Sequence, residues 1–195
     1  MPFKYDFRKR RDTFLKVMEL LEKSNAKTII ETGTSREGLK GAKSNGAATI
    51  VFGKWAKENN AFVHSVDISM ESVKNAQKEV NRQNLQSAVK IYHSDSLEFL
   101  ENFEERVDML YLDSYDYSSD VDIQKKSQQH HLEEFKKIER KLHENSIVLI
   151  DDCDLPNGGK GKLVIEYMGD RGWKILMDEY QVLLVRKNVV LDKVE

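Results

Sequence analysis

The sequence predicts an α/β fold, with a mostly parallel sheet of seven strands, helices on both faces and a C-terminal antiparallel hairpin strand. Short apolar runs alternate with helical stretches along most of the chain, which is typical of crossover units around a parallel sheet. Five of these runs in succession end in a carboxylate. The last two strand-like runs are separated by only a short polar gap, which indicates a hairpin.

The predicted elements follow from hydrophobic spacing. An amphipathic helix is expected over about residues 8–24, because Phe14, Val17, Met18 and Leu21 recur at helical intervals. The strands that follow end at Glu31, Asp67, Asp95, Asp113 and Asp151. Further helices are expected over about 47–59, 71–84, 96–104, 127–143 and 160–170, the last stopped by Gly172. Residues 173–187 then supply the hairpin.

Length and composition narrow the class of protein. The chain has 195 residues, with 39% hydrophobic, 33% charged and a net charge of −2. We expect a single domain over 1–195, with an N-terminal capping helix at 1–25 and a core at 26–187. The small net charge argues against a nucleic-acid partner, which calls for a basic excess. The basic run at 8–11 is interpreted as a solvated helix start.

Cysteine content and hydropathy indicate the compartment. Cys153 is the only cysteine, so no intrachain disulfide can form and a reducing environment fits. No apolar run reaches the roughly 18 residues of a membrane span, and no signal peptide is apparent. We therefore expect a cytoplasmic protein without a membrane partner.

The carboxylates at the strand ends point to a ligand site. In an open α/β sheet, ligands bind in the crevice outside the carboxyl ends of the strands. An aspartate after any one strand is also a common strand terminator or helix N-cap. Five such positions in succession favour a shared site over five independent caps.

The turn after the first strand reads TIIETGTSREG. Glu31, Gly33 and Gly38 give E-x-G-x-x-x-x-G, which differs from the G-x-G-x-x-G of dinucleotide sites. A P-loop is also excluded, because Ala42 stands where glycine must precede the lysine. A carboxylate here would repel a pyrophosphate and attract an ammonium group. The turn therefore suits a zwitterionic nucleoside.

Together these features resemble the class I S-adenosylmethionine-dependent methyltransferases, a Rossmann-like family, over about residues 26–187. The resemblance implies that the glycine turn contacts the methionine part of the cofactor S-adenosylmethionine. It also implies that Asp67 holds the ribose, with Ile68, Asp95 and Ser96 at the adenine. The residues placed at the cofactor in this way are Glu31, Gly33, Ser35, Gly38, Asp67, Ile68, Asp95, Ser96 and Asp113.

One departure concerns the turn itself. Ser35 stands where the family usually has its middle glycine, and a long stretch, expected to be flexible, runs from Arg36 to Gly46. Two interpretations stay open for this stretch, a lid over the ligand and an ordinary surface loop.

The ends of strands four and five resemble those of the metal-dependent, catechol-type O-methyltransferases. That resemblance implies that Asp113, Asp151 and Asp152 hold magnesium or calcium, for which oxygen ligands are suited. Asp116 stands where those enzymes carry a lysine, and Asp152 where they carry asparagine. Three clustered carboxylates require a metal, a protonated carboxylate or diverging side chains.

Without a metal, Asp113 or Asp116 is the candidate general base, and Tyr115 shapes the substrate pocket. His130 and His131 are expected in solvated or capping roles. Two interpretations stay open for Lys160: it contacts a substrate carboxylate or phosphate at the crevice, or it belongs to a turn into the last helix, which we favour.

The predicted function is methyl transfer from S-adenosylmethionine to an oxygen or nitrogen of a small molecule. Two alternatives are a catalytically silent module that binds the same cofactor and an oxidoreductase that uses a nicotinamide nucleotide. The sequence does not identify the methyl acceptor, and a homodimer stays open.

Overall fold

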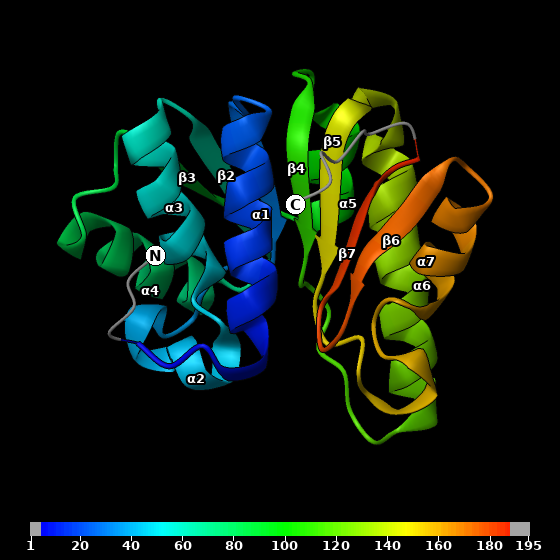
Figure 1. The fold of residues 1–195 in the computed structure, drawn as a ribbon. Coiled ribbons are helices and arrows are strands. Elements are labelled where there is room, and N and C mark those ends of the chain that lie inside the picture. The colour runs from blue at the N-terminus through cyan, green and yellow to red at the C-terminus, as the bar shows by residue number, and fades with distance from the viewer. Residues whose placement is uncertain (1–4, 188–195) are drawn as a thin grey trace.

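The computed structural model describes residues 5–187 and forms a seven-stranded sheet flanked by helices (Figure 1). The strands are β1 (Thr28–Thr32), β2 (Phe62–Asp67), β3 (Val89–His93), β4 (Val107–Leu112), β5 (Leu142–Ile150), β6 (Trp173–Asp178) and β7 (Val182–Arg186). Their spatial order is β3-β2-β1-β4-β5-β7-β6. The ends of the predicted domain, 1–4 and 188–195, lie outside the described residues.

Strand direction confirms the predicted fold class. The pairs from β3 through to β5 are all parallel, whereas β7 is antiparallel to both β5 and β6. Thr32 pairs with Val66 and with Leu112, and Leu112 pairs with Ile150. Strands β1, β2, β4 and β5 therefore end at one level, and the residues that follow them emerge side by side.

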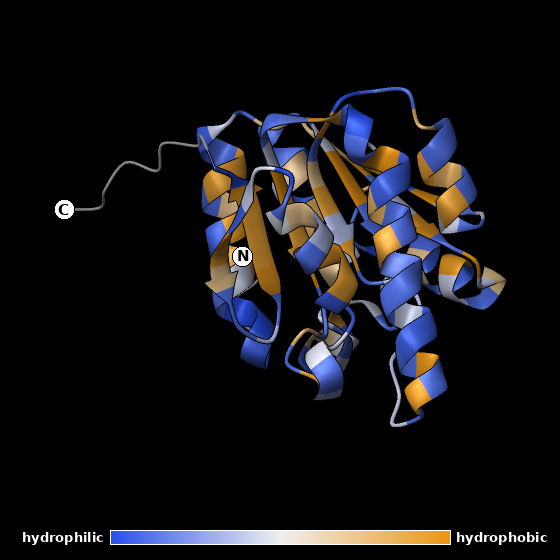
Figure 2. Ribbon diagram, turned by 90° about the vertical axis from the view of Figure 1, so that its right-hand side faces the viewer, coloured by the Kyte–Doolittle hydropathy of each residue, from blue (hydrophilic) through white to orange (hydrophobic). Residues whose placement is uncertain are grey.

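Helices cover both faces of the sheet. They are α1 (Arg11–Lys23), α2 (Ala42–Asn45), α3 (Ala48–Asn59), α4 (Met70–Arg82), α5 (Ser96–Asn102), α6 (Val121–Ile138) and α7 (Lys162–Gly169). On one face, Ile29 joins a core with α1, α3 and α4, and on the other Ile30 joins a core with α5, α6 and α7. Successive strand residues point to opposite faces, so β1 is apolar on both. Figure 2 shows the apolar strands enclosed by helices whose outer faces are largely hydrophilic.

Two predicted segments differ from the structure. Helix α6 begins at Val121 instead of 127, because Asp120 caps it by accepting from the N–H groups of Asp122 and Ile123. It ends at Ile138, and β5 already begins at Leu142. The sequence pattern missed this cap because aspartate and serine at 118–122 also fit a loop.

The stretch 36–46 is not the flexible loop that its composition indicated. It folds as a 3₁₀ turn (Gly38–Gly41) followed by α2. Leu39 and Ala42 are buried in the same core as α1 and α3. Hydrophobic burial thus holds this segment against the sheet layer.

Within residues 5–187, none of the helices is both long and apolar enough to cross a bilayer.

Candidate functional site

Two adjoining cavities open at the carboxyl ends of the strands. The larger has a volume of about 710 Å³ and the smaller about 280 Å³. Gly33, Arg36, Asp113 and Asp116 line both, so the cavities meet where β1 and β4 end. The predicted crevice therefore exists, and its charged strand ends face it.

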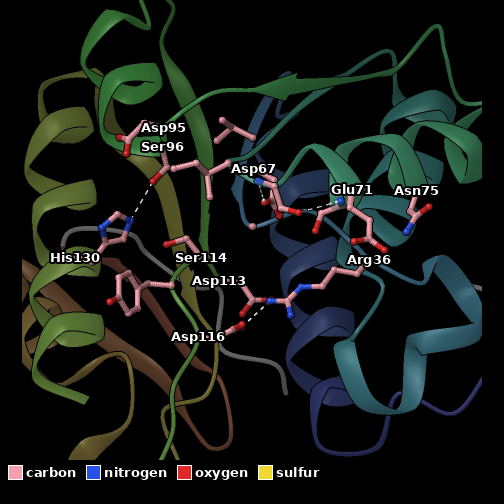
Figure 3. Close-up of a pocket in the computed structure, with 16 residues that line it drawn as sticks. Arg36, Asp67, Glu71, Asn75, Asp95, Ser96, Asp113, Ser114, Asp116 and His130 are labelled. Atoms are coloured by element: carbon pink, nitrogen blue, oxygen red, sulfur yellow. Dashed lines mark hydrogen bonds and ion pairs between the residues drawn. The ribbon is translucent and has the colours of Figure 1, made fainter. Parts of the chain in front are cut away.

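The larger cavity lies over β2 and the start of α5 (Figure 3). Its lining includes Gly33, Asp67, Ile68, Asp95, Ser96 and Asp113 from the predicted cofactor set. Asp67 accepts from the backbone N–H of Thr34 at 3.0 Å and of Ser69 at 2.7 Å. Ile68 is 71% exposed, which leaves an apolar surface free on the cavity wall. A carboxylate beside an exposed aliphatic group can bind a sugar hydroxyl and the face of a base.

Helix α6 contributes a histidine that the sequence interpretation left in a solvated role. His130 lines the larger cavity, with its Nε2 3.1 Å from the hydroxyl of Ser96 and 3.3 Å from Glu134. Burial acts to lower the pKa of His130, but the hydrogen bond with Glu134 holds that pKa above its ordinary value. His131 is fully buried, and burial lowers its pKa to about 4. The solvated role is therefore wrong for His131, whose imidazole is packed in the interior.

The glycine turn has a steric reason. Gly33 has φ of +83°, and a Cβ on it would lie 2.3 Å from the carbonyl oxygen of Asp113. Only glycine lets β1 turn this closely past the end of β4. Ser35 is buried and accepts from the backbone N–H of Thr49. Gly38 lies against Glu79 of α4 and is not among the residues that line either cavity.

Glu31 lies beneath this turn and lines the smaller cavity. It is 1% exposed, and its Oε2 accepts from the hydroxyls of Thr49 and Ser65. Burial raises the pKa of Glu31 to about 7, against the opposing effect of these hydrogen bonds. Its carboxylate thus sits in the interior next to the cavity.

The three carboxylates of the predicted metal site do converge. Asp113, Asp151 and Asp152 each have an oxygen within 4.8 Å of the others. Two basic side chains already contact them, and both come from segments that the sequence interpretation treated as ordinary. These are Arg10, from the 3₁₀ turn before α1, and Lys160, from the loop after β5.

Arg10 grips Asp151. Its Nε lies 2.9 Å from one carboxylate oxygen and its Nη2 2.7 Å from the other. Burial acts against ionisation of Asp151, yet the hydrogen bonds and charge of Arg10 hold its pKa below its ordinary value. Tyr180 stacks against the guanidinium and donates its hydroxyl to Asp152. The solvated role expected for the basic run is therefore wrong for Arg10.

Lys160 lies between the other two carboxylates. Its Nζ is 2.8 Å from Asp113 and 3.0 Å from Asp152. Burial acts to lower the pKa of Lys160, but the charges of Asp113 and Asp152 outweigh it and raise that pKa above its ordinary value. The pKa of Asp113 is itself raised, by burial and by the charge of Asp151, although Lys160 opposes this.

The remaining predicted catalytic residues lie at the rim. The Asp116 side chain is 72% exposed and pairs with Arg36. Tyr115 lines the larger cavity but not the smaller one. Its ring lies 5.5 Å from that of His130. Cys153 stays a protonated thiol near neutral pH, because burial raises its pKa to about 12.

Comparison with known proteins identifies the fold and the family. The family model described as a methyltransferase domain matches residues 43–153. No curated protein matches the sequence. Among solved structures, an O-methyltransferase from Bacillus cereus in complex with SAH has a TM-score of 0.62 at 15% identity, covering 90% of this chain and 81% of that one.

Two further structures show the same architecture. The SAH-bound methyltransferase PaMTH1 from Podospora anserina has a TM-score of 0.65 at 13% identity, covering 91% of this chain and 79% of that one. A methyltransferase from Geobacter sulfurreducens has a TM-score of 0.60 at 15% identity, with coverages of 94% and 81%.

Proposed function

The chain belongs to the methyltransferase-domain family as a class I S-adenosylmethionine-dependent enzyme, and from that premise we propose that it methylates an oxygen or nitrogen of a small polar acceptor. The observation that carries the proposal is the pair of cavities that meet at Gly33 and Asp113. One cavity has room for the nucleoside and the other for the acceptor, so the methyl group would pass between them.

The larger cavity is the proposed cofactor site. Its volume lies within the roughly 300–1,000 Å³ of small-molecule pockets. Asp67 would bind the ribose hydroxyls, and Ile68, Asp95 and Ser96 would surround the adenine. Gly33 at the junction would lie against the methionine part, whose amino group would extend past the junction to Glu31 at the edge of the smaller cavity. Two similar structures contain SAH (S-adenosylhomocysteine), which supports the assignment of the cofactor.

The smaller cavity is the proposed acceptor site. Its volume of about 280 Å³ favours a small molecule. Basic and acidic side chains line it together, among them Arg36, Asp152 and Lys160. These groups suit an acceptor with several polar atoms better than a hydrocarbon one, since a buried charge needs a polar partner.

The proposed reaction is an in-line displacement. A lone pair of the acceptor oxygen or nitrogen forms a bond to the methyl carbon, the carbon–sulfur bond breaks, and its electron pair stays on sulfur. The acceptor proton passes to Asp113, whose raised pKa makes it a better base than an exposed aspartate. Holding both reactants in adjoining cavities supplies much of the rate enhancement.

The silent binding module is the second candidate. It is favoured by one observation: Asp116 stands where the catechol-type enzymes have their lysine, and it is exposed and paired with Arg36. In that case the larger cavity would bind the cofactor and no acceptor would be methylated.

Calorimetric titration with S-adenosylhomocysteine tests the cofactor site. We expect binding to wild type and a loss of about tenfold or more in Asp67→Ala, since two hydrogen bonds of about 1 kcal/mol each would be removed. Asp170→Ala, at an exposed position after α7, is the matched control and should bind like wild type. Binding of a nicotinamide nucleotide instead would overturn the proposal.

A transfer assay separates the enzyme from the silent module. Wild type is incubated with S-adenosylmethionine labelled in its methyl group and a panel of small polar alcohols, phenols and amines. The proposal expects label on at least one acceptor class. Cofactor binding without transfer to any of them would favour the silent module.

A further inference from the structure

We propose that the ammonium group of Lys160 occupies the place of a divalent cation among the strand-end carboxylates, so that this side chain supplies the positive charge and no metal ion binds there. The inference rests on the proposed function, because it concerns the cation at the same reacting centre. It disagrees with the magnesium or calcium that the catechol-type resemblance implies.

The ammonium group is fully engaged. Its Nζ lies 2.8 Å from Oδ1 of Asp113, 3.0 Å from Oδ2 of Asp152 and 3.3 Å from the carbonyl oxygen of Ser114. Three acceptors match the three donors of an ammonium group. The side chain is only 3% exposed, so it cannot leave for solvent without opening the packing around it.

The third carboxylate is not free for a metal either. Both oxygens of Asp151 accept from Arg10, and Oδ1 also accepts from Gln181 at 2.8 Å. A magnesium or calcium ion needs six or more oxygen ligands at roughly 2.0–2.6 Å. Such an ion could therefore reach only Asp113 and Asp152, and only after Lys160 had been released from both of them.

Charge balance favours the same conclusion. Three carboxylates face two cations, which leaves one negative charge on the cluster when all five groups are ionised. A divalent ion added to this arrangement would make the cluster positive and would lie beside a buried ammonium group. Like charges repel strongly where water is scarce.

A glycine turn at Gly159 places Lys160 against the carboxylates. Gly159 has φ of +54°, and a Cβ on it would lie 1.9 Å from the carbonyl oxygen of Asp152. The loop after β5 can therefore fold back on Asp152 only with glycine here. The backbone N–H of Lys160 also donates to that carbonyl oxygen.

The positions of the charged residues along the chain fit the replacement of a metal ion by a side-chain cation. The three carboxylates belong to the segment 43–153 that matches the methyltransferase family model. Arg10 and Lys160 lie on either side of that segment. Lys160 would act as a positioning residue, since it holds Asp113 in place and balances its charge during the proton transfer.

Manganese binding followed by electron paramagnetic resonance tests the proposal, because Mn²⁺ takes the same oxygen ligands as magnesium. Wild-type protein should show no saturable site. Lys160→Met keeps the bulk of the side chain and removes its charge, so the freed carboxylates should bind one Mn²⁺ at least about tenfold more tightly than wild type. Lys162→Met, at an exposed position two residues on, is the control and should behave like wild type.

A double variant identifies the ligands. Lys160→Met combined with Asp152→Asn should lose the new manganese site. Thermal unfolding and S-adenosylhomocysteine binding report whether each variant folds and keeps its cofactor site, so failure of the proposed function is seen separately from failure of this inference.

Two results would overturn the inference. The first is one equivalent of Mn²⁺ bound by the wild type, which can be measured whether or not the variants fold. The second is a folded Lys160→Met protein that binds S-adenosylhomocysteine but no metal.

Discussion

The two cavities are built in different ways. The larger is lined mainly by residues at or just after the ends of β2, β3 and β4, and two of its carboxylates, Asp67 and Asp95, accept from backbone N–H groups two residues further on. The charged groups of the smaller cavity are held by side chains remote in sequence: Arg10 and Asp151 are 141 residues apart, and Lys160 and Asp113 are 47 apart.

The two cavities therefore differ in whether their carboxylates are held by contacts that are local or non-local in sequence. A carboxylate bound to neighbouring backbone keeps its position whenever its strand and turn form. A buried carboxylate balanced by a distant cation depends on the whole fold, and removing one partner leaves an uncompensated charge. Variants in the smaller cavity should therefore affect stability, whereas those in the larger should affect mainly cofactor affinity.

The largest effect is expected at Arg10. Arg10→Ala should lower the free energy of unfolding by about 3–5 kcal/mol, because Asp151 is 1% exposed and would keep a buried, unpaired charge. Urea denaturation measures the change. Arg11→Ala, at an exposed position, should stay within about 0.5 kcal/mol of wild type. Equal losses in the two variants would contradict the buried ion pair.

The pH dependence of Glu31 should be the next largest effect. Its folded-state pKa of about 7 is raised by burial from an ordinary 4.5, and Asp67 also faces it. The favourable contribution of protonated Glu31 is complete below pH 4.5 and is lost as the pH rises through 7. Wild type should therefore lose about 3 kcal/mol relative to Glu31→Gln between these limits.

Urea denaturation of both proteins at pH 5 and pH 8 measures this dependence. Glutamine keeps an oxygen for the hydroxyls of Thr49 and Ser65, so the uncharged variant is a close structural match. An unchanged difference between the two proteins at both pH values would show that Glu31 is not buried as described.

The turn at Gly159 gives a smaller effect. Gly159→Ala and Gly172→Ala both place a side chain at positive φ, but only at Gly159 would the Cβ overlap backbone atoms. We expect Gly159→Ala to cost about 1–3 kcal/mol more than Gly172→Ala. Thermal or urea unfolding of the pair decides this. Similar costs would mean that the loop carrying Lys160 adapts easily.

The smallest effect is expected at Asp116, which sequence reasoning made a candidate base. Its ion pair with Arg36 is exposed, so Asp116→Asn should change the free energy of unfolding by less than about 0.5 kcal/mol. A loss as large as that at Arg10 would show that the rim is as tightly coupled as the buried cluster.

Local patterns in the sequence were sufficient for the fold and the strand ends. Alternating apolar runs and helical spacing predict the sheet, because each element buries its own periodic face. The same runs place Asp67, Asp113 and Asp151 at the carboxyl edge. The start of α6 and the packing of 36–46 were missed, since a cap and a buried turn look like loops when read locally.

The sequence by itself determined the fold class, the methyltransferase resemblance and the position of Asp113, Asp151 and Asp152 at the ends of two strands. Only the tertiary structure decided what balances them. Arg10 and Lys160 resemble ordinary surface residues in the sequence, and nothing in their local patterns indicates burial. The choice of partner for a buried charge depends on which distant segments the folded chain brings within about 3 Å of it, and that distance exists only after folding.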